Sequence, residues 1–293
     1  MKIVKNKSVQ WVNVEKPTSK DLASLKKDFK LHPIIVDELR EPSARARVEH
    51  YDNYLYFIYY FPIYDKEDGA SVRTEIDFIV TKNAVATIHY MPLSGVLDDF
   101  DIGSCKSSFE LLRQLINHLL NFEERQLRHI REKVELVGHE IFHNKEKDVL
   151  EKITFLKRDA SEYRIIVRLQ RPILDSLAVI GKKFWGAESE IYLNDMIGDH
   201  LKIVNQLEDY REAIRDFEDT NNQLMNLKIN SAMKTFTSLS FITFPFMLFL
   251  TLFTIRTTDT PLIDGPHGFW IIAGITLAGM LALGVYFSNK KWF

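Results

Sequence analysis

The chain has 293 residues and a formal net charge of −2, and its single cysteine, Cys105, excludes an internal disulfide. Acidic and basic residues are balanced, so the composition argues against a nucleic-acid-binding protein and no nucleic-acid partner is expected. The mean hydropathy of −0.14 is typical of a soluble protein of one or two domains, but this average conceals a concentration of apolar residues near the C-terminus.

Residues 1–100 combine strand and helix patterns. Apolar and polar residues alternate around Trp11, as in a half-buried strand, and Pro17-Thr18-Ser19 and Pro33 are start signals for two short helices. Aromatic and β-branched residues then dominate three further segments, which predict strands joined by tight turns: 51–64, 73–81 and 84–90. We expect a cytoplasmic α/β domain with a mostly antiparallel sheet.

Residues 101–234 carry the periodicity of long amphipathic helices, with apolar residues at spacings of three and four. The main interruption lies at Pro172 and residues 181–186. One helix can run over residues 189–255, which is about 65 residues or on the order of 100 Å at the standard rise. Because the core of one chain cannot stabilise so long a helix, we expect a cytoplasmic stalk, or funnel, of associated helices.

Two uncharged apolar runs follow, residues 235–255 and 269–287, with a polar loop of residues 256–268 between them. Each run has about the 20 residues that a helix needs to cross a hydrocarbon core roughly 30 Å thick. The lysines near these runs lie before the first run, at Lys228 and Lys234, and after the second run, at Lys290 and Lys291, and none lies in the loop. The positive-inside rule therefore predicts a multi-pass protein of the plasma (inner) membrane, with both termini in the cytoplasm and the loop outside.

One motif suggests an enzyme. His139-Glu140-Ile141-Phe142-His143 matches HExxH, which places two imidazoles on one helix face beside a carboxylate, and Glu162 is available as a third zinc ligand. The structural alternative is a chance match on a solvated helix face, and we favour it because no strand-bounded active-site cleft surrounds the motif. We therefore expect no catalytic residues.

The first apolar run carries a mixed face in which polar and soft residues alternate with large apolar ones. These side chains either help membrane helices to pack, as small hydroxyl residues commonly do, or line a pore shared between chains. The sequence leaves both interpretations open. The face comprises Asn230, Met233, Thr237, Ser240, Phe244, Met247, Thr251 and Thr254.

The order of parts and several local sequences resemble the CorA family of divalent-cation channels, including its ZntB branch. The resemblance covers nearly the whole chain. The matching residues are Leu31-His32-Pro33-Ile34, Asp37-Glu38, Arg45 to Val48-Glu49, Tyr51, Asn230-Ser231-Ala232-Met233-Lys234, Pro245 and Lys290-Lys291-Trp292-Phe293.

This resemblance implies a homopentamer in a lipid bilayer, with the long helices as a cytoplasmic funnel, the first span around a pore and the second span outside it. It implies divalent cations, Mg²⁺ or a transition metal, as substrate or regulator and no organic cofactor. Carboxylates are suited to such hard cations. The resemblance places one regulatory carboxylate between subunits at Asp195, with Asp37 or Glu38 as its partner.

The chain departs from the family at the outer mouth of the pore. Family members end the first span with Gly-Met-Asn, whereas this chain has Thr254-Ile255-Arg256. A ring of arginines there would repel cations unless Asp259 and Asp264 pair with Arg256. We therefore expect either a metal transporter with altered selectivity or a non-conducting, signalling homologue that acts as a scaffold or cation sensor.

Overall fold

The computed structural model describes residues 1–43, 45–65, 69–93, 95–97, 100–103, 105–143, 146–254 and 267–290. The chain divides into two compact units, Met1–Glu218 and Asp219–Phe293. The boundary between them falls within one long helix, α6, which covers Ser189–Leu252.

The first unit contains a six-stranded sheet with the order β1-β2-β6-β5-β4-β3. Only β2 and β6 are parallel; the other neighbouring strands of this sheet are antiparallel, which confirms the predicted mostly antiparallel sheet. The edge strands β1 and β3 were not predicted, because their four and three residues are too short to show a clear alternation. The strands are β1 (Lys2–Lys5), β2 (Gln10–Glu15), β3 (Val48–His50), β4 (Leu55–Asp65), β5 (Ala70–Val80) and β6 (Ala84–His89).

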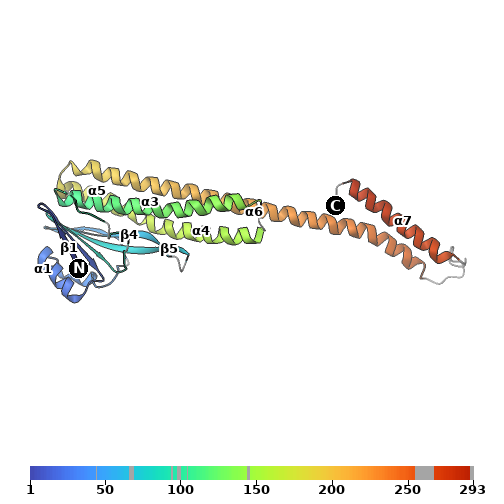
Figure 1. The fold of residues 1–293 in the computed structure, drawn as a ribbon, viewed down its shortest axis with the longest axis horizontal. Coiled ribbons are helices and arrows are strands. Elements are labelled where there is room, and N and C mark those ends of the chain that lie inside the picture. Colours follow the sequence, from blue (N-terminus) through green and yellow to red (C-terminus); the bar gives the residue numbers. More distant parts are fainter. Residues whose placement is uncertain are drawn as a thin grey trace. The chain divides into compact units, whose positions relative to one another are not determined.

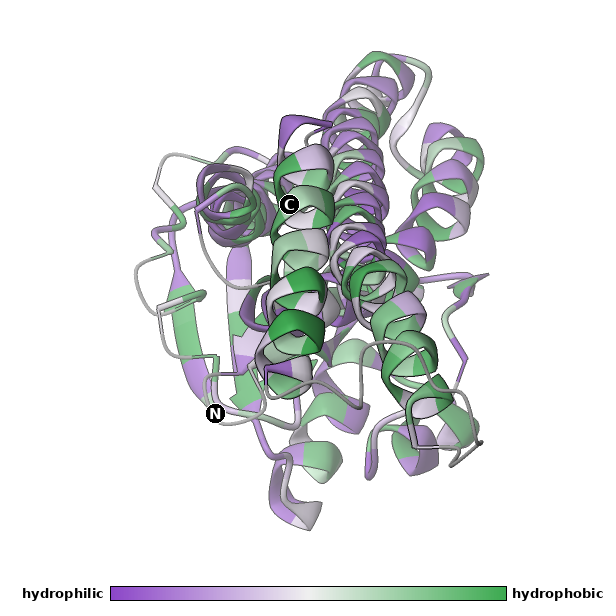
Figure 2. Cartoon of the chain, turned by 90° about the vertical axis from the view of Figure 1, so that its right-hand side faces the viewer, coloured by the Kyte–Doolittle hydropathy of each residue, from purple (hydrophilic) through white to green (hydrophobic). Residues whose placement is uncertain are grey.

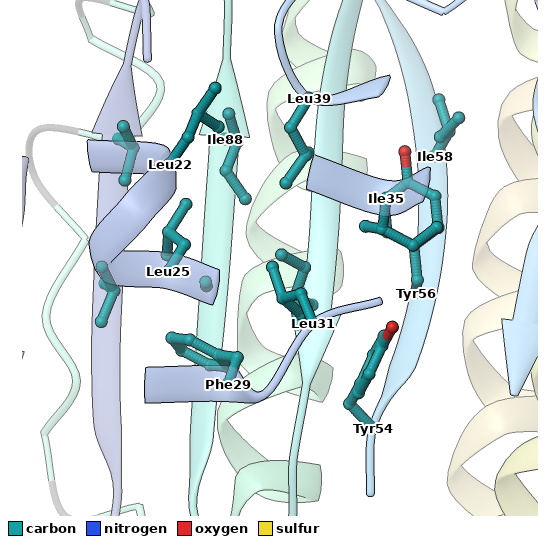
Figure 3. Close-up of a cluster of buried hydrophobic side chains, with 14 of the residues drawn as sticks. Leu22, Leu25, Phe29, Leu31, Ile35, Leu39, Tyr54, Tyr56, Ile58 and Ile88 are labelled. Carbon is teal, nitrogen blue, oxygen red and sulfur yellow. The ribbon is translucent and has the colours of Figure 1, made fainter. Parts of the chain in front are cut away.

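Helices α1 (Ser19–Phe29) and α2 (Pro33–Glu38) cover one face of this sheet (Figure 1). A capping box starts α1: the Asp21 N–H donates to the Thr18 hydroxyl oxygen at 3.3 Å, and the Thr18 N–H donates to the Asp21 carboxylate at 3.0 Å. Leucine and isoleucine side chains of both helices pack on Tyr54, Tyr56 and their neighbours, forming the core shown in Figure 3.

Helices α3 (Ser108–Glu140), α4 (Glu146–Arg168) and α5 (Gln170–Trp185) contact the strands from the other side (Figure 1). The interruption predicted at Pro172 is a helix break at Leu169, and Pro172 lies in the first turn of α5, where a proline is tolerated. The break between α3 and α4 was not predicted. It contains neither glycine nor proline, and the weaker stop signals, His139 in the last turn and Asn144 after it, were not recognised.

The second unit contains the end of α6 and helix α7 (Gly268–Asn289), and both helices are long and apolar enough to cross a membrane. Hydrophobic colours predominate on α7, the helix that ends at the label C in Figure 2. Helix α6 ends at Leu252, so the continuous helix is confirmed, but it stops before the predicted residue 255.

Candidate functional site

One face of α6 packs against α7 within the second unit. The Phe246 ring lies against Gly279, where an added Cβ would come within 2.5 Å of two ring atoms. At the border between this face and the opposite one, the rings of Phe241 and Phe287 have their centroids 6.5 Å apart. The α6 residues least exposed in this region recur at spacings of three and four and so share this α7-packed face: Ser238, Ile242, Phe246 and Phe249.

The residues predicted to line a pore occupy the opposite face of α6, apart from Thr254, which follows the helix, and all of them are exposed in the single chain. An α-helix turns by about 100° per residue, so this predicted pore face is centred about 180° from the α7-packed face. Met233, Phe244 and Met247 are 61%, 69% and 64% exposed. A face of this kind, left uncovered by α7, is free to contact other chains or an aqueous path.

Three hydroxyl groups on the predicted pore face donate to carbonyl oxygens of their own chain. Ser240 Oγ donates to Phe236 O at 2.9 Å, Thr251 Oγ1 to Leu248 O at 2.8 Å, and Thr254 Oγ1 to Thr251 O at 2.7 Å. These bonds use the hydroxyl protons and leave oxygen lone pairs directed outward. Such oxygens can still accept hydrogen bonds from water.

A shallow groove of about 520 Å³ lies on the same face, around Pro245. Met233, Thr237, Ser240 and Phe244 line it together with Phe236 and Phe241. The structure thus brings the middle of the predicted pore face together as one concave surface. Asn230 lies on α6 on the N-terminal side of this groove, and Thr254 lies beyond the C-terminal end of the helix. Arg256, Asp259 and Asp264 lie outside the described residues.

The three carboxylates expected to hold a regulatory ion lie on different elements. Asp37 and Glu38 are at the end of α2, where Asp37 pairs with Arg40 at 3.3 Å and Glu38 pairs with Arg47. Asp195 is exposed on α6. Among the described residues, no three His, Cys, Asp or Glu side chains converge as a metal site. An ion held by three such ligands within the described parts would therefore need a second chain.

The HExxH segment shows no zinc-site geometry. Helix α3 ends at Glu140, so His143 lies beyond it, and His143 Nδ1 is 3.0 Å from the His139 carbonyl oxygen. Glu140 pairs with Lys152 on α4. The motif is thus accounted for by a helix end with an interhelical ion pair.

Sequence reasoning missed four buried carboxylates in the described part of the first unit, those of Glu75, Asp77, Glu123 and Asp159. Asp77 and Asp159 are each 1% exposed, and Glu123 is 0% exposed. Burial raises the pKa of Glu123 to about 8 and that of Asp77 to about 7. A signal existed for Glu123: it continues the apolar series of α3 four residues after Leu119, so an acid occupies a core position.

We expect Gly279→Ala to weaken the packing of α7 on α6. The new methyl group would overlap the Phe246 ring, and overpacking of this kind costs about 1–3 kcal/mol. Thermal unfolding of the detergent-solubilised protein measures the loss. Gly274→Ala and Gly284→Ala are matched controls on the same helix, since an added Cβ at either position meets nothing within 4 Å. A loss of equal size in all three variants would contradict this assignment.

Comparison with known proteins identifies the family. The model of the CorA-like Mg²⁺ transporter protein family matches residues 6–291. The chain belongs to this family. A cobalt/magnesium transport protein CorA of Thermotoga maritima is 22% identical over 96% of this chain and 83% of its own length.

Solved structures share the fold. The CorA magnesium transporter of Methanocaldococcus jannaschii superposes with a TM-score of 0.83 at 18% identity, over 99% of this chain and 93% of that one. The full-length CmaX protein superposes with a TM-score of 0.73 at 19% identity, over 97% of this chain and 89% of that one. The predicted fold is thus confirmed along nearly the whole CorA-like chain.

Proposed function

We propose that this CorA-like chain forms a membrane channel for divalent cations, Mg²⁺ or a transition metal, in which α6 lines the pore and α7 lies outside it. The observation that carries the proposal is the division of α6 into two opposite faces. One face is packed on α7; the other is exposed, partly polar and hollowed by a groove. Small hydroxyl residues commonly face other helices or water in membrane proteins, which supports placing this face inside an assembly.

One α6 helix cannot enclose a pore, so several chains are required. The family resemblance makes a homopentamer the assembly that we propose. Asn230 and the hydroxyl oxygens of Ser240, Thr251 and Thr254 would then contact a hydrated cation. The side chains of Met233, Phe244 and Met247 would form apolar constrictions that gate by excluding water.

The ends of α7 carry the side chains expected at the two membrane–water interfaces, and we place both termini in the cytoplasm because Lys228, Lys234, Lys290 and Lys291 lie beyond the ends of the two apolar runs that face away from the loop. At its start, the adjacent rings of Phe269 and Trp270 are 74% and 73% exposed, as expected for an aromatic belt. At its other end, the Lys290 ammonium lies 5.9 Å from the Tyr286 ring centroid. A basic residue beside an aromatic one suits the cytoplasmic interface.

Ion selectivity is proposed to differ from that of family members with Gly-Met-Asn. Arg256 stands in place of the filter asparagine, so a pentamer would carry a ring of positive charge unless Asp259 and Asp264 neutralise it. For regulation, Asp195 of one subunit with Asp37 or Glu38 of another remains our proposal. A cation there would have to displace Arg40 or Arg47 from its carboxylate.

Flux measurements test this function. We expect purified protein in liposomes to conduct at least one of Mg²⁺, Co²⁺, Ni²⁺ and Zn²⁺ but not a monovalent control, and Arg256→Asn to raise the flux by removing positive charge. Met233→Ala on the predicted pore face should change the flux severalfold. Leu239→Ala, about a quarter turn outside that face, should leave it unchanged. Absence of flux for every divalent cation would contradict the proposal.

The second candidate function is a non-conducting homologue that acts as a membrane scaffold or cation sensor. The replacement of the filter motif by Thr254-Ile255-Arg256 favours it. In that case neither the wild type nor Arg256→Asn conducts, while divalent cations still change the thermal stability of the assembled protein.

A further inference from the structure

The carboxylate of Asp77 occupies the middle of the sheet, on the face covered by α1 and α2. It is 1% exposed and accepts one hydrogen bond on each oxygen. The Tyr56 hydroxyl donates to Oδ1 at 3.1 Å, and the Tyr90 hydroxyl donates to Oδ2 at 2.7 Å. Tyr56 comes from β4 and Tyr90 follows β6, so one side chain of β5 joins both neighbouring strands.

This junction extends to the segment between α2 and β3. The Arg47 guanidinium lies 5.5 Å from the Tyr56 ring centroid and pairs with Glu38 of α2 and Glu49 of β3. Arg47 therefore connects Tyr56 to Glu38 at the end of α2, so a displacement of the Tyr56 ring would affect the Arg47–Glu38 ion pair.

Glu75, two residues before Asp77 on β5, makes a second contact with the segment between α2 and β3. Glu75 accepts a hydrogen bond from the Ser43 N–H at 2.8 Å, and the Tyr60 hydroxyl donates to the Ser43 carbonyl oxygen at 2.6 Å. The Arg73 guanidinium lies 4.8 Å from the Tyr60 ring centroid. Among the described residues, the charged groups that act on Asp77 are Glu75 and Arg47, and its phenol partners are Tyr56 and Tyr90. Glu38 and Glu49 are joined to this group through Arg47, and Arg73 and Tyr60 lie beside Glu75.

Among the described residues, no lysine or arginine forms an ion pair with Asp77, whose direct partners are neutral phenols. Burial, with the nearby Glu75 charge adding to it, raises the pKa of Asp77 to about 7. The two phenol donors satisfy the ionised form. When Asp77 gains a proton, its own O–H must be accepted, and one tyrosine must turn its hydroxyl from donor to acceptor or leave.

We propose that the Asp77 carboxyl responds to pH, and that its protonation state controls how firmly the segment between α2 and β3 is held against the sheet by Arg47. Ionised Asp77 holds Tyr56 and Tyr90 together. Protonated Asp77 either reverses the direction of one of these hydrogen bonds or releases it, and either change alters the support of Arg47 by Tyr56, and with it the ion pairs to Glu38 and Glu49. The device lies in the first unit and does not depend on the ion path proposed above.

Hydrogen exchange of the full-length protein tests this. Protection of peptides that cover residues 38–49 is measured from pH 5.5 to 8.5, with exchange times scaled for the intrinsic pH dependence. We expect wild-type protection to change sigmoidally with a midpoint near pH 7, as the Asp77 carboxyl titrates. Asp77→Asn should remove the pH dependence.

Two further variants keep the test decisive if Asp77→Asn fails to fold. Tyr90→Phe keeps the carboxylate but removes a donor to its ionised form, so the midpoint should rise by about one pH unit. Glu75→Gln should keep a sigmoidal change, with its midpoint moved down because a negative charge beside Asp77 is removed. Flat protection in the wild type, or an unmoved midpoint in Tyr90→Phe, would overturn the proposal. So would loss of the transition in Glu75→Gln.

Discussion

Lys133→Met should lower the free energy of unfolding of the first unit by about 3 kcal/mol, because it leaves a buried carboxylate without its cation. Lys133 Nζ is 3.0 Å from Asp159 Oδ2, and Asp159 is 1% exposed. The other oxygen of Asp159 accepts the Ser71 N–H and hydroxyl, both at 2.9 Å. One carboxylate thus joins α4 to α3 and β5. The loss falls at the low end for a broken buried pair, since the Lys133 side chain is 36% exposed.

Lys157→Met is the matched control. It breaks a pair of similar length, 2.6 Å to Glu218, whose side chains are 51% and 33% exposed. Solvent screens such a pair, so the expected loss is below about 1 kcal/mol. Urea unfolding of the full-length protein, followed by tryptophan fluorescence, measures both losses. Equal losses in the two variants would show that burial of Asp159 does not set the effect.

Glu123→Gln should flatten the dependence of stability on pH between about pH 7 and 8. The Glu123 side chain is 0% exposed on α3, and the Gln170 amide of α5 donates to one of its oxygens at 2.5 Å. Burial raises its pKa to about 8, well above the ordinary 4.5. The folded protein therefore binds a proton that the unfolded chain has already lost at neutral pH.

Because the pKa of Glu123 is higher in the folded protein than in the unfolded chain, the stability of the folded protein falls as pH rises. The stabilisation linked to the Glu123 proton is complete below about pH 4.5, falls as pH rises, and is lost above about pH 8. Each pH unit in this window costs about 1.4 kcal/mol. Asp77 contributes a fall of the same sign that weakens above pH 7, so the larger share of the fall from pH 7 to 8 belongs to Glu123.

Thermal unfolding across this interval checks the expectation. Wild type should lose stability from pH 7 to 8, whereas Glu123→Gln, which keeps the shape but has no proton to lose, should lose much less. Glu124→Gln changes the next residue, which is exposed, and should behave like the wild type. An unchanged slope in Glu123→Gln would mean that Glu123 is ionised in the folded protein.

Much of the fold was predictable because its signals are local and long. The two uncharged runs predicted both membrane helices, and the lack of any proline between residue 189 and Pro245, with Gly198 as the only glycine there, predicted the continuous α6. The edge strand β3 was missed because its three residues are stabilised by pairing with β4, which is a tertiary effect. The break after α3 has no proline or glycine to mark it.

The candidate site was predictable only in part. Spacing grouped Met233, Ser240 and Phe244 on one face, but only the contact of Phe246 with Gly279 shows that α7 leaves this face uncovered. Asp77 and Asp159 were not singled out, since acids in strands and helices are usually solvated. Their burial depends on partners distant in sequence, such as Ser71, which lies 88 residues from Asp159.

The seating of the Phe246 ring in the space beside Gly279 also limits how the membrane hairpin can move. The Phe246 ring fills the space that a side chain at residue 279 would occupy. Sliding of α7 along α6, or rotation of α6 about its own axis, would therefore first require the ring to leave this space. Widening of a path along the opposite face of α6 would therefore occur by tilting of α6 and α7 together as one rigid pair.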